Sequence, residues 1–485
     1  MVPVLLILIP LITGILLFAV KQEATAKSIA LLASLLSLAL MLAGMSGYID
    51  AAQMTYDQPW LGGINSRFHF ALDGMSQLLC LLTTLSFPII IYSTWNNCYD
   101  DSNRFFGLVL LSQAGLLGVF MALDALLFYF FWELALIPLY FLCSRWGGER
   151  RIQVTIKFFI YTFIGSLFMM IGLIMLDFKA GGSFAWSDFL NLKMTSGQEL
   201  GIFLMLAIAF AIKMPLFPFH TWQPDTYEQS PTAVTMILSA IMAKMGVFGL
   251  LRWLAPIVPS ATFLWGDNFA TLAVIGMLYA SFIAMRQDDL KRLVAYSSIA
   301  HIGLMILAIF APSYSGIQGA MIQMFNHGIN ILGMWIVVNV IEQKFGTRKI
   351  SELGGLAQKA PVLTILLVIV ALANIAMPLT NAFIGEFMMF NGVLGSTATK
   401  FGLAYTIAAL VTIILSAVYT LRMIQRVFYG ETNELTSKAT DISFNVKLSL
   451  AIIVVGIILI GVFPKPLLSL TSEISADILG RMNLK

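Results

Sequence analysis

Apolar blocks of about 20 residues recur along the whole chain, and a helix of that length crosses the hydrocarbon core of a bilayer. Only 11% of the 485 residues are charged, whereas an ordinary soluble domain carries about 25%. We therefore expect an all-α membrane protein of about 14 transmembrane helices. The expected spans are 2–20, 28–46, 74–94, 105–122, 123–145, 154–176, 200–219, 231–255, 262–285, 293–311, 316–341, 361–379, 402–424 and 448–463.

The charges between the spans predict the orientation of the chain. Lys and Arg are concentrated in loops on one side, such as 145–151, 286–292 and 344–359, and cytoplasmic loops carry this excess. Both termini then lie on the outer side, in agreement with an even number of spans. Few loops are long, which leaves no room for a soluble catalytic domain. The longest are 47–73, 177–199 and 425–447.

Two spans contain a Met-Pro pair inside an apolar run, Met214-Pro215 and Met377-Pro378. Proline removes a backbone donor and clashes with the preceding turn, so both helices are predicted to break there. Irregular backbone survives at membrane depth only where it is buried in protein or lines a wet cavity. Two broken helices at matching places indicate an internal repeat of the kind found in transporters.

Few ionisable side chains remain within the spans once the loop charges are set aside. A charged residue at mid-span costs about 2.5–3.5 kcal/mol on an insertion scale, so these positions are candidate functional sites. The candidates are Glu133, Lys213, Lys244, His301, His327 and Glu386.

Glu133 and Lys213 are predicted to be partners. Glu133 has almost wholly apolar and aromatic neighbours, and Lys213 lies about 20 Å into its span, directly before Met214. Burial favours the neutral form of each side chain, whereas a nearby opposite charge favours the charged form. A lysine balanced between these effects can load and release a proton. A fixed ion pair and a neutral, hydrogen-bonded glutamic acid are the alternatives.

Lys244 lies at a similar depth in the next span, and no acidic residue lies within one helical turn of it. Its partner must therefore be water or a group on another helix, unless backbone carbonyls alone hold the amine. His301 and His327 occupy consecutive spans between Lys244 and the distal acid Glu386, which favours a proton relay. The alternatives are hydrogen-bonded core histidines and a glutamate at the membrane interface.

The sequence predicts no metal or cofactor site. Cys80, Cys98 and Cys143 are far apart and form no CxxC pair, and there is no glycine-rich phosphate loop. The small net charge of +3 does not indicate nucleic acid binding. The mixed-sign cluster at 286–292 is expected to be a solvated loop without a role in proton transfer.

Several motifs stand in order over most of the chain: 131–140 (FWELALIPLY), 211–215 (AIKMP), 220–225 (HTWQPD), 230–233 (SPTA), 289–298 (DLKRLVAYSS) and 385–387 (GEF). With these motifs the sequence resembles the antiporter-like membrane subunits of proton-pumping NADH:quinone oxidoreductase, respiratory complex I. The resemblance implies about 14 helices in total, two inverted five-helix repeats, broken seventh and twelfth helices, and a central polar axis. The implied segments are 1–104 (first three helices), 105–255 (first repeat), 256–425 (second repeat) and 426–485 (last helix and tail).

Two features favour the branch of this family called subunit M. Glu386 follows the second broken helix, where relatives usually have lysine, and Ile331 stands where the largest relatives tend to have lysine. The chain also ends after the last span, with no long lateral helix expected. The resemblance gives proton-transfer roles to Glu133, Lys213, Lys244 and Glu386, and relay roles to His301, His327 and His220.

The resemblance implies a proton-translocating subunit whose complex reduces quinone elsewhere. This chain binds no cofactor itself, and FMN and iron–sulfur clusters belong to other subunits. Its expected partners are the two related antiporter-like subunits on either side and membrane lipids, in the inner (cytoplasmic) membrane. The alternative is a subunit of a multisubunit sodium/proton antiporter. A subunit that binds quinone itself is a weaker third reading, because no loop offers an evident headgroup site.

Overall fold

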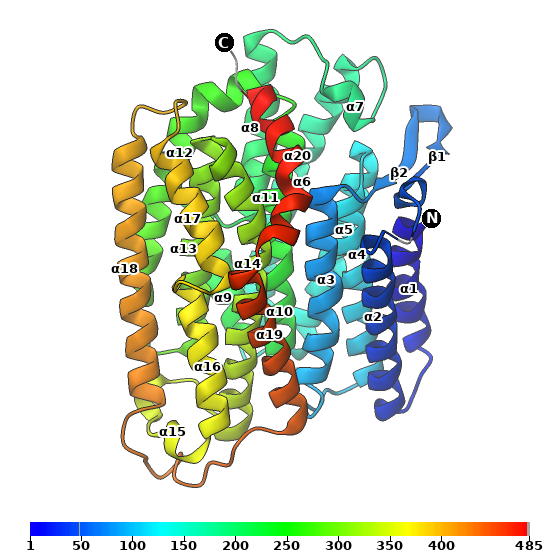
Figure 1. Ribbon diagram of the computed structural model, residues 1–485. Helices are drawn as coiled ribbons and strands as arrows, with labels where there is room; N and C mark the ends of the chain where they lie inside the picture. Colours follow the sequence, from blue (N-terminus) through cyan, green and yellow to red (C-terminus); the bar gives the residue numbers. More distant parts are fainter. Residues whose placement is uncertain (48, 483–485) are drawn as a thin grey trace.

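The computed structural model describes residues 1–47 and 49–482, which form a bundle of long helices (Figure 1). Twelve helices in this described part are long and apolar enough to cross a membrane. They are α2 (Glu23–Met45), α3 (Gly74–Ser93), α4 (Ser102–Met121), α5 (Ala125–Trp146), α6 (Arg151–Lys179), α8 (Ser196–Lys213), the composite helix Thr232–Leu254, α12 (Pro259–Ala284), α13 (Leu290–Phe310), α14 (Tyr314–Phe345), α18 (Gly402–Val427) and α19 (Phe444–Val462).

Two shorter apolar helices, α1 (Val2–Leu17) and α16 (Pro361–Asn374), coincide with the two remaining expected spans. The predicted class, an all-α membrane protein, is confirmed. The remaining helices are α7 (Trp186–Phe189), α9 (Trp222–Gln229), α15 (Leu356–Lys359), α17 (Asn381–Leu394) and α20 (Lys465–Met482), with short 3₁₀ turns at Ala51–Met54, Gly62–Ile64 and Ile350–Glu352.

Polar side chains set the starts of several helices. Asp73, Asp124, Asp289 and Ser313 each accept a hydrogen bond from a backbone N–H in the first turn of α3, α5, α13 and α14. Such caps satisfy donors that have no partner inside the helix. Because these capping residues stand between apolar runs, the sequence itself marks where the helices begin.

The distribution of apolar side chains fits a membrane environment. Helices at the edge of the bundle, such as α1 and α18 in Figure 1, expose large apolar residues that water would not tolerate in such numbers. By contrast, the most apolar windows of Thr232–Leu254, α13 and α14 are entirely buried. These three central helices also carry buried charged and histidine side chains, so the polar groups are gathered inside the bundle and away from lipid.

Both Met-Pro pairs interrupt a helix, as predicted. In the first break α8 ends at Lys213, the chain turns through Pro215 with φ 21°, and α9 resumes at Trp222. In the second break α16 ends at Asn374 and α17 begins at Asn381. Ala376 and Leu379 adopt left-handed backbone with φ of 53° and 72° between them. Left-handed backbone outside glycine is uncommon, and it persists where the surrounding structure enforces it.

Two elements were not expected from the sequence. The loop at 47–73 contains an antiparallel hairpin of β1 (Thr55–Leu61) and β2 (Ser66–Ala71), with Thr55 opposite Ala71. The expected C-terminal tail is the helix α20, which packs on α3, α12 and α14. A helix of 18 residues in this tail was not predicted. Both elements have too few consecutive apolar residues to give the signal of a span.

Both ends of the described chain lie on the same side of the bundle. The ammonium group of Met1 donates a hydrogen bond to the carbonyl of Gln53, in the loop before α3. The start of α3 in turn lies against α20, because a Cβ on Gly74 would collide with the carbonyl oxygen of Leu470. Figure 1 shows this end at the top, together with the hairpin and α7, and α15 at the opposite end.

Candidate functional site

Lys244 lies at the centre of the bundle, on a helix with irregular hydrogen bonding. The composite helix consists of α10 (Thr232–Ile237), a π-helical segment (Leu238–Met242), α11 (Ala243–Gly249) and a second π-helical segment (Leu250–Leu254). π-helical turns inside α-helices are rare and occur frequently at functional sites. Lys244 therefore has a distorted turn on both sides of it, and its side chain has no exposed surface.

The partners of Lys244 come from its own helix and from α14. Its Nζ donates to the carbonyl oxygen of Ser239 at 2.5 Å and lies 2.8 Å from Nδ1 of His327. Since a lysine ammonium has no acceptor, Nδ1 of His327 accepts this bond whenever Lys244 is protonated. The predicted partner on another helix is thus a histidine and not an acid.

His327, His301 and Glu386 continue the line from Lys244. The rings of His327 on α14 and His301 on α13 lie 5.7 Å apart between their centroids. Nδ1 of His301 lies 3.1 Å from Oε1 of Glu386 on α17, and Nε2 of Gln323 donates to the same oxygen at 3.2 Å. Four predicted site residues are thereby brought together, in the order Lys244, His327, His301 and Glu386.

Three of the four groups of this line have a polar atom that is free for a further contact. Within the described part of the chain, Nε2 of His301, Nε2 of His327 and Oε2 of Glu386 are buried without a hydrogen-bond partner. Leaving a buried polar atom without a partner is costly, so such atoms in native proteins usually face ordered water or take part in function. Each of these three residues has two polar atoms, so it can receive a proton at one and release a proton from the other.

A small cavity adjoins the end of the line. His301 and Glu386 line it together with Thr412 and Ser416 of α18, and its volume is about 10 Å³, close to one water molecule. Oγ of Ser416 has no partner among the described residues either. The rest of the lining is apolar, so these four polar residues are gathered at a small cavity with otherwise apolar walls.

Two glycines let the helices approach closely enough to form this line. A Cβ on Gly246, two residues after Lys244, would lie 2.7 Å from Cβ of Met214 at the first break. A Cβ on Gly385, next to Glu386, would lie 2.4 Å from Oε1 of Gln323. Both distances are shorter than a real contact allows, so the two positions require glycine for close packing.

Lys213 and Glu133 are neighbours but not a direct ion pair. Nζ of Lys213 lies 5.2 Å from the ring centroid of Trp132, the residue that precedes Glu133, in cation–π geometry. In the described residues neither Nζ of Lys213 nor Oε1 of Glu133 has a hydrogen-bond partner. Lys213 is buried, whereas Glu133 is half-buried. No ion pair joins these two described side chains, and the amine of Lys213 lies over the ring of the residue next to Glu133 in the chain.

His220 stands apart from the other candidates. It lies in the first break, is buried, and packs against the rings of Phe217 and Tyr279 at centroid distances of 5.6 and 5.2 Å. Its Nδ1 has no hydrogen-bond partner in the described chain. Among the described residues, the ring contacts of His220 are with Phe217 and Tyr279 and not with the line of four residues, so it lies beside the broken helix.

The expectation of a solvated loop at 286–292 was wrong. Lys291 and Arg292 lie in the first turn of α13, and Lys291 is 2% exposed. Nζ of Lys291 forms an ion pair with Oε2 of Glu342 at 3.0 Å. Arg292 pairs with Asp225 at 3.2 Å and with Glu228 at 2.7 Å. The helix begins three residues before the expected span, which brings these cations under the end of α14.

Sequence reasoning missed Glu342 altogether. This residue lies one position beyond the expected span 316–341, where a charge looks like an ordinary residue of a loop. In the structure α14 continues to Phe345, so Glu342 is on the last turns of the helix, within reach of Lys291. The only signal was the pairing of an acid and a base at the ends of two consecutive spans. For metals, residues 1–47 and 49–482 contain no group of three or more potential ligands among His, Cys, Asp and Glu.

Comparison with known proteins adds the family. Residues 122–412, which include all seven candidate residues, match the family described as NADH:quinone oxidoreductase/Mrp antiporter, TM. The chain is 36% identical to F(420)H(2) dehydrogenase subunit M of Methanosarcina mazei over 489 aligned positions, covering 97% of both chains. It is 35% identical to NADH-quinone oxidoreductase subunit M of Escherichia coli K12, covering 96% of this chain and 94% of that one.

A solved structure supports the same assignment. The fold matches a chain of respiratory complex I from Thermus thermophilus with bound NADH, with a TM-score of 0.90 and 29% identity. The match covers 99% of this chain and 100% of that chain. The predicted resemblance to the M branch is confirmed. The chain therefore belongs to the NADH:quinone oxidoreductase/Mrp antiporter transmembrane family, and proteins similar to it over nearly their whole length are M subunits.

Proposed function

We propose that this chain carries protons across the membrane as the M subunit of a complex that couples quinone reduction to proton pumping. The observation that carries the proposal is the continuous line of buried groups from Lys244 through His327 and His301 to Glu386. Burying an ionisable residue within a membrane costs free energy. Four such residues gathered from four helices therefore indicate a common function.

The direction of transfer follows from the proposed orientation. With the basic loops in the cytoplasm, both termini lie outside, in the periplasm of an inner membrane. Protons then enter the axis from the cytoplasmic side, pass Lys244, His327 and His301, and leave from Glu386 toward the outside. In this scheme His220, beside the first break, is a further relay position. The segments 105–255 and 256–425 are the two proposed inverted repeats, each with one broken helix.

Lys213 and Glu133 supply the driving element in this proposal. A proton that crosses 100 mV costs about 2.3 kcal/mol. Two unit charges 4 Å apart interact by about 4 kcal/mol at an effective dielectric of about 20. A movement that brings Glu133 closer to Lys213, or farther from it, past Trp132 therefore changes the proton affinity of Lys213 by a sufficient amount. Because no redox group is predicted on this chain, the movement originates in other subunits, with the two related antiporter-like subunits as the proposed neighbours.

The electron donor of the complex is not set by this chain. One similar protein belongs to an F(420)H(2) dehydrogenase and another to an NADH-quinone oxidoreductase, at nearly equal identity. The proposal is therefore a proton-translocating M subunit, with flavin and iron–sulfur clusters in partner subunits. A sodium/proton antiporter subunit is the competing assignment. Co-purification of flavin and iron–sulfur proteins with this chain supports the redox complex, whereas small membrane partners alone contradict it.

The test of the proposed function is the proton yield of Lys213 and Glu133 variants in the whole complex. In membrane vesicles, Lys213→Ala is expected to assemble but to lose most of the pumping that accompanies quinone reduction. Glu133→Gln is expected to be worse than Glu133→Asp, since the amide fills the space but cannot stabilise a lysine cation. Wild-type proton yield in Lys213→Ala rejects the assigned role. Equal yields in the two Glu133 variants point to packing alone.

A further inference from the structure

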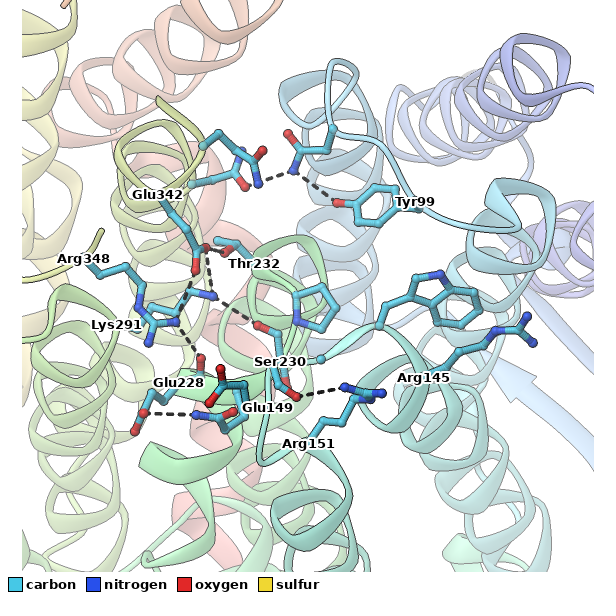
Figure 2. A pocket seen from close by; sticks show the side chains of 18 of the residues that line it. Tyr99, Arg145, Glu149, Arg151, Glu228, Ser230, Thr232, Lys291, Glu342 and Arg348 are labelled. Atoms are coloured by element: carbon cyan, nitrogen blue, oxygen red, sulfur yellow. Dashed lines mark hydrogen bonds and ion pairs between the residues drawn. The ribbon is translucent and has the colours of Figure 1, made fainter. Parts of the chain in front are cut away.

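A large polar cavity lies outside the line of four residues, and the Lys291–Glu342 ion pair is part of its lining, here called its floor. It opens among the loops after α3 and α5, the end of α9, the start of α13 and the end of α14, with a volume of about 820 Å³ (Figure 2). All of these segments lie at the end of the bundle with the basic loops, which is the proposed cytoplasmic side. A polar cavity of this size admits many water molecules.

Figure 2 shows Lys291 and Glu342 pointing toward each other at the inner end of this cavity. Oε2 of Glu342 lies 3.0 Å from Nζ of Lys291 and accepts a 2.7 Å hydrogen bond from Oγ1 of Thr232. Nζ of Lys291 also donates to the carbonyl of Ser230 at 3.2 Å, and Arg348 lies 3.2 Å from Oε1 of Glu342. The side chain of Glu342 is 26% exposed and that of Lys291 is 3% exposed, so water reaches the carboxylate first.

A stripe of small hydroxyl side chains connects this floor to Lys244. Thr232, Thr235 and Ser239 are spaced by three and four residues, so they share one face of the composite helix, and all three are buried. Ser239 is also the residue whose carbonyl binds Nζ of Lys244. From Thr232 to Lys244 the helix is about 18 Å long. This stripe therefore covers most of the distance between the cavity and the proton-carrying line.

The hydroxyl nearest Lys244 has free hydrogen-bonding capacity. Within the described residues, Oγ of Ser239 is buried without a partner. Oγ1 of Thr235, one turn earlier, donates to the backbone carbonyl of Tyr227 at 3.2 Å. Buried hydroxyls without partners are usual places for ordered water, and residues one helical turn apart are close enough for one water to bridge.

We propose that the cavity is the cytoplasmic water funnel of the subunit and that Glu342 is the first residue of the chain to accept a proton from it. This inference rests on the proposed function, because it supplies the proton that Lys244 carries. A proton from water in the cavity binds Oε2 of Glu342, and the ion pair with Lys291 is lost. Glu342 then releases the proton toward Thr232. Each hydroxyl accepts one proton and gives up another, until neutral Lys244 receives one at Nζ.

Lys291 is a positioning residue in this scheme. In the resting ion pair it holds Glu342 ionised and therefore ready to accept a proton. Once Glu342 is protonated, the Ser230 carbonyl still holds the ammonium group of Lys291. The buried cation then opposes a return of the positive charge from the axis toward the cavity, as expected for a gate.

The test compares variants of the floor, the stripe and the mouth of the cavity in the intact complex. The measured quantity is protons translocated per electron in vesicles, with Lys244→Ala as the reference for a blocked axis. Glu342→Gln is expected to show the same loss as Lys244→Ala. Glu149→Gln, an exposed lining residue of the same cavity, is the matched control and keeps the wild-type ratio. Ser239→Ala is expected to lower the pumping rate without affecting assembly, since its hydroxyl has no protein partner to lose.

The outcomes separate this inference from the proposed function. If Lys244→Ala pumps normally, the proposed function itself fails. If Lys244→Ala is blocked but Glu342→Gln and Ser239→Ala keep the wild-type ratio and rate, protons reach Lys244 by another route and the inference is overturned. Should Glu342→Gln fail to assemble, Ser239→Ala decides the matter: a wild-type pumping rate overturns the inference, and a lowered rate in an assembled complex supports it.

A native cysteine offers an independent measurement of access to the cavity. Cys98 is exposed and lines the mouth of the cavity, while Cys80 and Cys143 are buried. A bulky, membrane-impermeant maleimide added to the cytoplasmic face is expected to label Cys98 and to slow pumping. The Cys98→Ser variant should keep its pumping rate under the same treatment. No labelling from the cytoplasmic face, or labelling without an effect on pumping, contradicts the funnel.

Discussion

At the scale of single residues, the contacts that form the line of four join residues that are far apart in the sequence. Glu386 meets His301, 85 positions earlier, and His327 meets Lys244, 83 positions earlier. Neither pair has a local sequence signature. The residues themselves could be predicted, because charged and histidine side chains inside apolar spans are rare and conspicuous. The order of the line could be proposed only from the succession of spans.

Glu386 provides the residue-scale prediction. Glu386→Gln keeps the size of the side chain and can still bind His301 or Gln323, but it has no charge to exchange during a cycle. We expect the proton yield per electron to fall while assembly is retained. Glu386→Lys, the residue usual among relatives in this family, is expected to keep part of the yield because lysine also exchanges a proton. Proton yield is to be measured directly, and not growth alone.

An exposed acid gives the control for this prediction. Glu352 lies outside the spans and forms a surface ion pair with Lys349 at 2.9 Å. Because exposed pairs contribute about 0–1 kcal/mol, Glu352→Gln should leave pumping and assembly unchanged. If Glu386→Gln behaves like Glu352→Gln, Glu386 is not an obligatory step, and the proton leaves the axis from His327 or His301 through water.

Residues at the ends of spans were the least predictable. The boundary of a membrane span carries an error of a few residues, because apolar and polar positions alternate there. Lys291 and Glu342 fell on the wrong side of that boundary, so their charges looked like ordinary loop charges. The surroundings of Lys213 could not be predicted in detail for another reason. Apolar neighbours in the sequence indicated burial, but they did not show that the ring of Trp132 lies beneath the amine.

At the scale of elements, the broken helices were predictable and the close approach of their neighbours was not. Proline within an apolar run is a local signal with a steric cause. The need for glycine at position 246 depends on how near α11 comes to Met214, which only the folded arrangement determines. The hairpin and α20 were not predicted because neither contains a long run of apolar residues.

Gly246 gives the first prediction at this scale. Gly246→Ala places a Cβ 2.7 Å from Cβ of Met214 and 2.8 Å from the carbonyl oxygen of Phe210, so α11 must move away from the first break. Overpacking of this kind costs about 1–3 kcal/mol. We expect a lower melting temperature of the purified complex and a reduced proton yield. Gly456→Ala on α19 is the matched control, since no atom lies within 4 Å of its added Cβ. Equal melting temperatures for both variants would contradict the packing argument.

Asp124 gives the second prediction at the scale of elements. Its Oδ1 accepts hydrogen bonds from Leu127 N at 3.0 Å and from Oγ of Ser66 at 2.9 Å, and its Oδ2 accepts one from Arg67 N at 2.8 Å. One carboxylate thus caps α5 and fastens the hairpin to it. Loss of a cap alone costs about 0.5–2 kcal/mol, so Asp124→Ala should destabilise this corner and release the hairpin to proteases.

The conservative variant tests the role of charge at the same corner. Burial raises the pKa of Asp124 above its usual range, so the site disfavours the ionised form relative to water. Asp124→Asn keeps the acceptor for Leu127 and Ser66 and removes the charge, and it should be much less damaging than Asp124→Ala. Protease resistance of β1 and β2 in the two variants is the measurement. Equal damage would show that the charge, together with the bond from Arg67 N that an amide nitrogen cannot accept, matters more than the two bonds that asparagine keeps.

At the scale of the whole molecule, the outer surface of the bundle suits contact with lipid, whereas the polar groups lie in its interior. Apolar side chains cover the outer helices, while lysine, histidine and glutamate gather on the three fully buried central helices and on α17. A soluble protein of this length would bury the apolar residues and expose the charges. The composition alone predicted this inversion, and it also predicted that the functional groups would lie at the centre of the bundle.

The last prediction concerns how the whole chain lies in the membrane. Both described ends lie on the side of the hairpin, opposite α15 and the loops that carry most of the basic residues. If those loops are cytoplasmic, a reporter fused to the C-terminus must lie outside, and one inserted between Lys344 and Lys359 must lie inside. Alkaline phosphatase, active only outside, should be active at the C-terminus and silent in the loop, and a cytoplasmic fluorescent reporter should give the opposite pattern. Because the two ends share a side, a C-terminal reporter active in the cytoplasm would place both ends in the cytoplasm and invert the whole bundle in the membrane. It would therefore overturn the proposed direction of transfer from Lys244 to Glu386 as well as the orientation.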